Sequence, residues 1–327
     1  MKISLIIPVY NAEKTLPATL ESIASQTFRD FEVIFADDAS TDGTPALLEE
    51  FCRQWGSACK LLRKEVNSGA AAARNMALDA AEGEYLTFAD ADDILAADML
   101  QKASDAADAS GADIVGWDWT LQMRRYGRYM RQADYSTPAE AVRALTGGRM
   151  RWNLWLFLVR RSLIEDNGIS FVEGADMAED MQFMLRSFLK AGTTYQIHES
   201  LYSYNGINDN SISKGFSEQK RRQTEINLAL VEDAFSASSM AQDMPEAMLE
   251  LKLFLKRPLL TGMNKSDYET WYGWFPESNA LAAEGGQAPR HTRILQKMAA
   301  RRFWPGVRIY SFLVNKLMYG IIFRLTA

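Results

Sequence analysis

Carboxylates that follow an apolar segment offer oxygen ligands for a cation. The segment at residues 84–89 ends in Asp-Ala-Asp-Asp at positions 90–93. Two carboxylates can hold a hard cation while a diphosphate and water supply its other ligands. We therefore expect Asp92 and Asp90 to bind Mn2+ or Mg2+. The alternative is a turn or a helix cap near Ile94, which is the commoner role of an isolated Asp-x-Asp triplet.

A second set of polar residues can contact a nucleotide. Asp38 follows the apolar segment at residues 31–36 and can accept hydrogen bonds from a base or a ribose. Arg74 lies in an alanine-rich helical segment and can reach a phosphate or a base, while Tyr10 can stack on a base. The alternatives are a solvated turn for Asp38, a surface helix position for Arg74, and packing at a strand end for Tyr10.

A third acidic site is the pair Glu179-Asp180. A carboxylate suits the role of general base, because it can take the proton of an acceptor hydroxyl as a new bond forms. The alternative is an acidic first helical turn that the helix dipole favours.

The composition limits the chemistry. The chain of 327 residues has two cysteines, Cys52 and Cys59, and two histidines, His198 and His291. We therefore expect neither a disulfide framework nor a zinc site of Cys and His, and any metal should have oxygen ligands. The first residues lack the long apolar region of a signal peptide, so we expect a cytoplasmic protein.

Charge is distributed unevenly along the chain. Residues 1–284 hold 28 basic and 42 acidic residues, whereas the segment from Gly285 onward holds eight basic residues and no acidic one. A basic tail suits an anionic surface, but an acidic body argues against wrapping a polyanion. We expect no nucleic-acid partner.

Apolar and helical segments alternate at the start of the chain. Strands are expected at residues 3–9, 31–36, 60–64, 84–89 and 112–120. Helices are expected at residues 16–26 and 46–55 and after Ser68, the last ending at Gly83. This order predicts an α/β fold with a mostly parallel sheet flanked by helices, and ligands bound at the carboxyl ends of its strands.

These segments, taken in order, resemble a known family. The matching segments are Pro8-Val9-Tyr10-Asn11, Asp37 to Thr44, Asn67-Ser68-Gly69, Ala73-Arg74-Asn75 and Asp90 to Asp93. Together they closely resemble the inverting, bacterial-type family 2 glycosyltransferases of the GT-A fold. The resemblance is specific over residues 1–100 and moderate over residues 152–213.

The resemblance implies that the first half of the chain binds a nucleotide sugar, usually a uridine diphosphate sugar. Pro8, Tyr10 and Asn11 would border the base. Asp38 would bind uracil, and Arg74 would lie against the nucleotide.

The resemblance also implies the remaining site residues. Asp92 would be the principal metal ligand, with Asp90 near the metal or the ribose. Asp180 would be the catalytic base. Glu179 and Trp155 would belong to the acceptor side.

Two positions depart from the family pattern. Ala39 stands where many relatives have glycine, which constrains the approach of the backbone. Many relatives also have an Arg and a His before the Ser-Ile-Ser found here at residues 211–213, where this chain has Asn205, Ile207 and Asn208. The resemblance therefore does not imply that this loop binds the diphosphate or the metal.

The implied reaction is one in-line displacement that inverts the anomeric carbon. A hexose would move to a hydroxyl of a saccharide or lipid-linked saccharide, in the synthesis of a cell-surface polysaccharide or glycolipid. One alternative is a sugar-phosphate nucleotidyltransferase, although residues 8–13 lack the glycine-rich basic loop of that class. The other is a non-catalytic nucleotide- or carbohydrate-binding module.

Three parts are expected along the chain. Residues 1–110 would form the nucleotide-sugar-binding half of the GT-A domain, and residues 111–215 the acceptor-binding and catalytic half. Residues 216–327 would form a helical extension.

The end of this extension suits an anionic membrane surface on the cytosolic side. Basic residues at helical spacing are followed by aromatic and apolar ones, as at membrane interfaces: Arg290, Arg293, Lys297, Arg301, Phe303, Trp304, Tyr310, Phe312, Leu313, Leu317, Met318, Tyr319 and Ile321. A membrane span is not expected, because Pro305, Arg308 and Lys316 interrupt the apolar stretch. The alternative is that the apolar residues pack onto the catalytic domain.

Overall fold

The computed structural model describes residues 1–206 and 217–314 and divides them into two compact units. Unit 1 comprises Met1–Ala141 and Trp152–Ser236. Unit 2 comprises Val142–Arg151 and the chain from Ala237 onward. Each unit has its own hydrophobic core.

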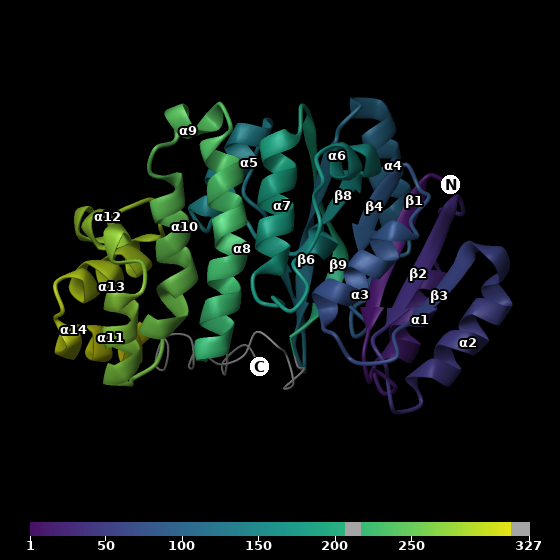
Figure 1. Ribbon diagram of the computed structural model, residues 1–327, viewed down its shortest axis with the longest axis horizontal. Helices are drawn as coiled ribbons and strands as arrows, with labels where there is room; N and C mark the ends of the chain where they lie inside the picture. The colour runs from purple at the N-terminus through teal and green to yellow at the C-terminus, as the bar shows by residue number, and fades with distance from the viewer. Residues whose placement is uncertain (207–216, 315–327) are drawn as a thin grey trace. The chain divides into compact units, whose positions relative to one another are not determined.

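Unit 1 is built on one sheet (Figure 1). Its strands are β1 (Ile3–Val9), β2 (Phe31–Asp37), β3 (Cys59–Arg63), β4 (Tyr85–Phe88), β5 (Ile94–Leu95), β6 (Ile114–Gln122), β7 (Gly127–Met130), β8 (Phe157–Arg160) and β9 (Thr194–Asn205). Their order is β3-β2-β1-β4-β8-β6-β9-β5, and β7 pairs with β6 outside this path. Strands β1 to β4 are parallel, as are β6 and β9, whereas β8 is antiparallel to both of its neighbours. The predicted α/β fold is confirmed.

The register places three loops at one edge of this sheet. Val9 at the end of β1 pairs with Asp37, and Ile6 pairs with Phe88 at the end of β4. The loops that follow β1, β2 and β4 therefore leave the sheet at the same edge, as expected for parallel strands. Every residue of β2 is buried, which is typical of a strand covered on both faces.

Helices flank the sheet of unit 1 (Figure 1). They are α1 (Leu16–Ala24), α2 (Thr44–Trp55), α3 (Ala70–Asp79), α4 (Met99–Ser110), α6 (Arg161–Asp166), α7 (Glu179–Lys190) and α8 (Glu218–Ser236), with short 3-10 turns η1 (Gly56–Ala58) and η2 (Leu154–Leu156). A further helix, α5 (Pro138–Thr146), begins in unit 1 and ends in unit 2. The expected helices at residues 16–26, 46–55 and after Ser68 are thus present.

The predicted role of Gly83 is wrong. Helix α3 ends at Asp79, and its C-cap residue is Ala80 in a right-handed conformation. Gly83 instead lies against β1, where an added Cβ would be 2.5 Å from the main-chain nitrogen of Ser4. Glycine is needed here for close approach of two backbone segments, and not to end a helix.

The segment after Asp93 does not form the helix that the alternative of a helix cap near Ile94 requires. Ile94 and Leu95 form β5 and pair with β9, and the next helix begins only at Met99. Asp92 and Asp93 therefore do not cap a helix at this point.

The two cysteines are joined by a disulfide between the end of α2 and the start of β3. Cys52 and Cys59 are seven residues apart in sequence, with a Cα–Cα distance of 5.1 Å. The expectation that the two cysteines form no disulfide is therefore wrong, because the turn between α2 and β3 brings them together.

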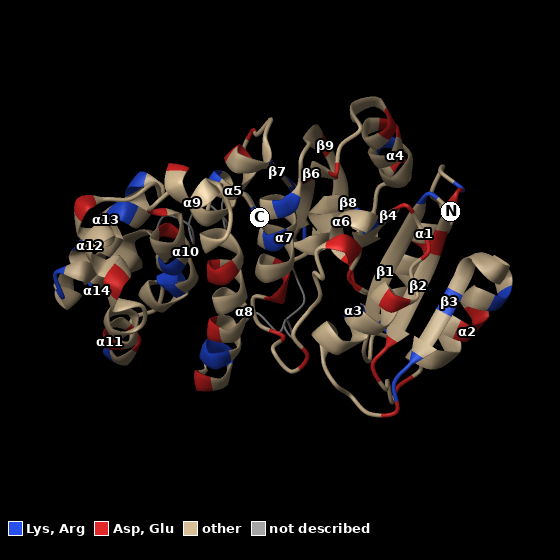
Figure 2. Cartoon of the chain, turned by 45° about the horizontal axis from the view of Figure 1, so that its top comes forward, with Lys and Arg blue, Asp and Glu red and all other residues tan. Residues whose placement is uncertain are grey.

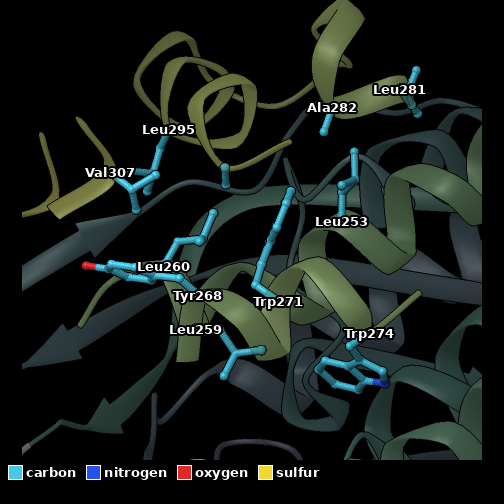
Figure 3. Packing of buried hydrophobic residues seen from close by; sticks show 11 residues of the cluster. Leu253, Leu259, Leu260, Tyr268, Trp271, Trp274, Leu281, Ala282, Leu295 and Val307 are labelled. Carbon is cyan, nitrogen blue, oxygen red and sulfur yellow. The ribbon is translucent and has the colours of Figure 1, made fainter. Parts of the chain in front are cut away.

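Unit 2 is helical throughout its described part. Its elements are α9 (Met240–Asp243), α10 (Ala247–Lys256), η3 (Arg257–Leu260), α11 (Lys265–Gly273), η4 (Pro276–Ser278), α12 (Asn279–Glu284), α13 (Arg290–Ala300) and α14 (Trp304–Ser311). Trp271, Tyr268 and Leu260 lie in its core, with Leu295 of α13 and Val307 of α14 (Figure 3). Over the described residues, no helix combines the length and the apolar character that crossing a bilayer requires.

Candidate active site

Arg74 brings the predicted acidic residues of unit 1 together. Its side chain is only 8% exposed, and Nη1 donates to Glu179 Oε1 at 2.7 Å. The same nitrogen lies 3.5 Å from Asp180 Oδ1, and Nη2 lies 3.6 Å from Asp90 Oδ1. One buried guanidinium therefore joins the end of β4 to the start of α7. The alternative of a surface position for Arg74 is wrong.

Further contacts fix α3 against the loop before α7. Asn75 exchanges two hydrogen bonds with the main chain of Phe171, each 3.0 Å long. Asp176 Oδ1 accepts a hydrogen bond from the Ala71 main-chain nitrogen at 2.8 Å. The Arg74 guanidinium also lies over the Phe171 ring, 5.6 Å from its centre. The position of Arg74 is thus set by folding.

The pair Glu179-Asp180 lies in the first turn of α7, as expected. The preceding residue, Ala178, has a φ of 64°, a left-handed conformation that is uncommon for a residue with a Cβ. Asn227 of α8 holds the loop before it by donating to the main-chain oxygens of Ala175 and Met177 at 2.8 and 2.9 Å.

Burial and mutual repulsion perturb the carboxylates. Burial, followed by the charge of Glu179, raises the pKa of Asp180 well above its ordinary value, although Arg74 partly offsets this. Burial likewise raises the pKa of Asp90 to about 6, with Arg74 lowering it and Asp92 raising it. These carboxylates together hold the pKa of Arg74 above its usual range, despite the opposing effect of burial. The site carries an excess of negative charge that suits a cation.

Asp93 and Tyr202 position the acidic loop after β4. The buried Asp93 accepts hydrogen bonds from the Tyr202 hydroxyl at 2.8 Å and from the Asn205 main-chain nitrogen at 2.7 Å. The same hydroxyl accepts a hydrogen bond from the Asp90 main-chain nitrogen at 3.0 Å. Burial, with the charges of Asp90 and Asp92, raises the pKa of Asp93 to about 9.

Trp155 belongs to a buried aromatic stack behind this loop. Its ring is stacked on Tyr202 at 4.6 Å and on Tyr204 at 5.6 Å, and its edge contact with Trp119 is 5.2 Å. With 3% of its surface exposed, Trp155 supports Tyr202. Its predicted contact with an acceptor stays a prediction.

Asp38 is buried and caps the chain before α3. Its two carboxylate oxygens accept hydrogen bonds from the main-chain nitrogens of Ser68 and Gly69, each at 2.8 Å. The alternative of a solvated turn is therefore wrong for Asp38. Each oxygen has a second lone pair, so the predicted contact with uracil stays a prediction.

The loops after β1 and β2 are tied to each other. Asn11 Oδ1 accepts a hydrogen bond from the Thr41 main-chain nitrogen at 2.8 Å, and the Asn11 nitrogen donates to Ser40 Oγ at 2.9 Å. Tyr10 is 50% exposed next to this junction, and Pro8 is partly buried below it. Ala39 has a φ of 62°, which is the physical reason for the glycine of many relatives.

The chain offers only part of a metal coordination shell. Among the residues that the structure describes, no group of three or more His, Cys, Asp or Glu side chains could hold a metal. Asp90 and Asp92 at one strand end, with their excess negative charge, fit a cation whose remaining ligands come from a bound diphosphate and water.

His198 and the loop after β9 lie beyond the residues discussed so far. His198 lies 3.2 Å from Asp118 Oδ2 and 3.0 Å from Asp134 Oδ1, so it is paired with carboxylates. Ile207, Asn208 and the Ser-Ile-Ser at residues 211–213 lie outside the described residues.

The chain is similar in sequence to glycosyltransferases. The sequence profile of "Glycosyl transferase family 2" matches residues 4–175. The uncharacterized glycosyltransferase EpsJ of Bacillus subtilis is 28% identical over 262 residues, which cover 74% of this chain and 73% of EpsJ. The poly(ribitol-phosphate) beta-N-acetylglucosaminyltransferase TarS of Staphylococcus aureus is 33% identical over 209 residues, which cover 62% of this chain and 35% of TarS.

Solved structures share the fold. The crystal structure of S. aureus TarS 1-349 in complex with UDP-GlcNAc superposes with a TM-score of 0.73 and 22% identity, covering 97% of this chain and 92% of that one. The mannosyltransferase PcManGT from Pyrobaculum calidifontis, in complex with GDP-Man and Mn2+, gives a TM-score of 0.51 and 18% identity, with coverages of 95% and 87%.

Proposed function

Because the chain belongs to glycosyl transferase family 2 and is a glycosyltransferase, we propose that it transfers a hexose from a uridine diphosphate sugar to an acceptor hydroxyl with inversion. The observation that carries this proposal is the buried contact of Arg74 with Asp90, Glu179 and Asp180. It joins the strand end that would hold the donor to the helix that would activate the acceptor. The family leaves no reason to propose a nucleotidyltransferase or a non-catalytic module.

The donor would bind at the edge where β1 and β2 end. Tyr10 offers an exposed ring, and Asp38 is held rigidly by two main-chain hydrogen bonds. Pro8 and Asn11 would border the base, and Arg74 would approach the nucleotide from α3. The complexes of TarS with UDP-GlcNAc and UDP support a uridine nucleotide.

Asp180 is a better general base than Glu179. Glu179 forms a 2.7 Å ion pair with Arg74, so its carboxylate is already engaged by a cation. Asp180 Oδ1 accepts no hydrogen bond from the described residues, and its pKa is raised. A carboxylate whose pKa lies closer to neutral pH takes up a proton more readily during the reaction.

The reaction would proceed in one step. Asp180 takes the proton of the acceptor hydroxyl while the hydroxyl oxygen forms a bond to the anomeric carbon. The bond from that carbon to the donor phosphate breaks, and the nucleoside diphosphate leaves. Attack opposite the leaving group inverts the anomeric configuration.

Asp92 and Asp90 would hold a divalent cation, Mn2+ or Mg2+, through carboxylate oxygens. Such a cation would stabilise the negative charge on the departing diphosphate. The role of Asp93 and Tyr202 is to keep the Asp90 segment in place through their hydrogen bonds.

A panel of nucleotide sugars tests the proposal. Each compound is scored by the rise in the midpoint of thermal unfolding and by hydrolysis in the presence of Mn2+, because a ligand that binds the native state stabilises it. We expect uridine diphosphate sugars to give the largest shift and the fastest hydrolysis. Neither binding nor hydrolysis of any nucleotide sugar would overturn the proposal.

We also propose that unit 2 contacts an anionic membrane surface, where a lipid-linked acceptor would be found. Figure 2 shows basic positions on α13, and Arg290 and Arg293 are exposed. On α14, Ile309 is 61% exposed, and Phe312 directly after it is 41% exposed. Exposed basic and apolar side chains on consecutive helices suit binding at a membrane interface.

The other side of α13 and α14 packs against the protein, as in the alternative to membrane binding. Leu295 and Val307 lie in the core of unit 2, and Trp304 donates to Glu269 at 2.9 Å. Tyr310 also packs against this core. The last residues of the tail, from position 315, lie outside the described residues.

A further inference from the structure

Helix α7, which carries Glu179 and Asp180, begins without a cap of its own. Its N-cap residue is Ala178, whose methyl side chain cannot accept a hydrogen bond, and the φ and ψ of this residue are 64° and 23°. The usual N-cap residue is Ser, Thr, Asp or Asn in an extended conformation. The Gln182 nitrogen donates to the Ala178 oxygen at 3.2 Å, so the conformation of Ala178 sets the direction of the first helical turn.

The left-handed conformation of Ala178 needs support from outside this turn. For a residue with a Cβ, the left-handed conformation is disfavoured by a factor of about 5 to 30, whereas glycine adopts it freely. Such a conformation persists only where surrounding contacts hold it in place. The contacts of the pre-α7 loop, residues 174–177, therefore decide how α7 begins.

One contact of the pre-α7 loop is with the start of α3. Asp176 Oδ1 accepts a hydrogen bond from the Ala71 main-chain nitrogen at 2.8 Å. Gly69 leaves room for this carboxylate, because an added Cβ would lie 2.2 Å from Asp176 Oδ2. The middle of the loop is thus fixed to α3.

The other contacts of the pre-α7 loop are with α8, which lies beside α7 (Figure 1). Asn227 Nδ2 donates to the main-chain oxygens of Ala175 and Met177 at 2.8 and 2.9 Å. Gln223 Nε2 donates to the main-chain oxygen of Gly174 at 2.9 Å. Residues four apart lie on one face of a helix, so two amides of α8 hold the loop from the same side.

Packing alone does not explain an asparagine at position 227. The side chain of Asn227 is fully buried, and its oxygen Oδ1 accepts no hydrogen bond from any described residue. A buried amide oxygen without a partner costs free energy, which an apolar side chain of similar size would avoid. The two hydrogen bonds that Asn227 donates to the loop offset this cost.

Helix α8 lies in unit 1 but beyond residues 4–175, which the family profile matches. The expected helical extension starts at residue 216, so α8 is its first helix. This helix contacts the loop directly before the two acidic residues of α7.

We propose that Asn227 is a positioning residue for the catalytic base. Its hydrogen bonds keep Ala178 in the left-handed conformation, which directs the first turn of α7 and with it the Asp180 carboxylate. A misplacement of about 1 Å can lower the rate of an enzyme about a hundredfold. In this role Asn227 touches neither substrate, so the affinity for the nucleotide does not depend on it. The inference rests on the proposed function, because it takes Asp180 as the base.

The test compares the rate of the reaction with the affinity for the nucleotide. The turnover number is measured for hydrolysis of a uridine diphosphate sugar with Mn2+ present, and the Kd of UDP is measured by calorimetry. Asn227→Ala removes both donors to the loop. Thr224→Val is the matched control, because Thr224 is buried on the same helix but donates within it, to the Lys220 main-chain oxygen at 2.9 Å.

Asn227→Ala should lower the turnover number about tenfold to a hundredfold and change the Kd of UDP by less than about twofold. Thr224→Val should lower the midpoint of thermal unfolding but change the turnover number by less than about twofold.

Ala178→Gly separates positioning from a general loss of stability. Glycine adopts the left-handed conformation without strain, so the turn needs less help from α8. In the Ala178→Gly background, the loss of activity caused by Asn227→Ala should therefore be at least about fivefold smaller. A purely structural role of Asn227 predicts the same loss in both backgrounds.

The proposal is overturned if Asn227→Ala is as active as wild type, if Thr224→Val loses as much activity, or if Ala178→Gly does not reduce the loss. Should Asn227→Ala fail to fold, Gln223→Ala decides in its place, because this side chain is only partly buried. A fall of about threefold in its turnover number, as for one neutral hydrogen bond, supports the proposal, and an unchanged turnover number overturns it.

Asp180→Asn is measured alongside these variants. If it is fully active, or if the wild type hydrolyses no nucleotide sugar, the proposed function is contradicted instead. Activity retained in Asn227→Ala but lost in Asp180→Asn contradicts only the role of Asn227.

Discussion

Replacing Asp180 by Asn should lower activity and raise stability at the same time. Asn keeps the shape of the side chain but cannot take a proton, so transfer should fall about a hundredfold to ten-thousandfold, equivalent to about 3–5 kcal/mol in the barrier. Binding of the donor should be unchanged, because the side chain belongs to the proposed acceptor side. The assay is release of nucleoside diphosphate at saturating donor and acceptor.

The gain in stability follows from the raised pKa. Burial and Glu179 make Asp180 harder to ionise in the folded chain than in the unfolded chain, so its charge opposes folding at neutral pH. Each unit by which the folded pKa is raised corresponds to about 1.4 kcal/mol. As the pH falls below the ordinary value of 3.8, the carboxyl is protonated in both states and the penalty disappears. The advantage of Asp180→Asn should therefore be full above the raised pKa and vanish near pH 4.

Glu179→Gln is the matched control, because it removes a charge from the same helical turn. It breaks the 2.7 Å ion pair with the buried Arg74 and should lower the free energy of unfolding by roughly 1–3 kcal/mol. Thermal unfolding without metal or donor measures both variants, with a shift of about 2–4 °C for each kcal/mol. If Asp180→Asn kept more than a tenth of the activity, or unfolded at a lower temperature than wild type at neutral pH, the reasoning would be refuted.

The other predictions concern the metal, the nucleotide, the acidic loop and the membrane. Excess EDTA should abolish transfer and Mn2+ or Mg2+ should restore it; full activity in EDTA would exclude the metal role. Asp38→Ala should weaken binding of free uridine diphosphate, measured by calorimetry, and unchanged affinity would contradict the contact with the base. Tyr202→Phe should destabilise unit 1 by roughly 1–3 kcal/mol, because it removes a donor to Asp93 and an acceptor for the Asp90 nitrogen; an unaltered unfolding midpoint would count against this network. Ile309→Ser together with Phe312→Ser should lower the fraction of protein that sediments with anionic vesicles at low salt, while the midpoint of unfolding stays within a few degrees. If wild-type protein ignores such vesicles, the membrane proposal fails.

A truncation of the tail is not a clean test of the membrane proposal. Removing the chain from Arg290 onward would also remove Leu295 and Val307 from the core of unit 2. Such a truncation would expose apolar surface and lose stability whether or not the tail binds lipid. Substitutions on the exposed side of α14 avoid this ambiguity.

The strands and helices near the N-terminus could be predicted because their signals are local. Continuous apolar segments such as residues 3–9 and 31–36 indicate strands buried on both faces, and the polar loops that follow them indicate the ligand edge. The misassigned Gly83 shows the limit of this reasoning. Its close contact with Ser4 involves a residue 79 positions away, and no pattern around Gly83 reports it.

The candidate site shows the same limit. The types and spacing of Asp90 and Asp180 indicated their chemistry. The ion pair of Arg74 with Glu179 could not be predicted, because the two residues are 105 positions apart in sequence. The hydroxyl of Tyr202 reaches Asp93 across 109 residues, and nothing in the sequence pattern marked it. Side chains whose partners are distant in sequence are found only when the fold brings them together.

The hydrogen bonds of Asn11 with Ser40 and Thr41 have a consequence for the thermodynamics of donor binding. They order two loops at the proposed nucleotide edge during folding, so binding there would not have to reduce the conformational entropy of those loops. Asn11→Ala would transfer that ordering to the binding step. The donor would then bind with a less favourable entropy, in addition to any contact with the base that Asn11 itself supplies. Part of the affinity for the nucleotide would thus reside in hydrogen bonds between two loops of the protein.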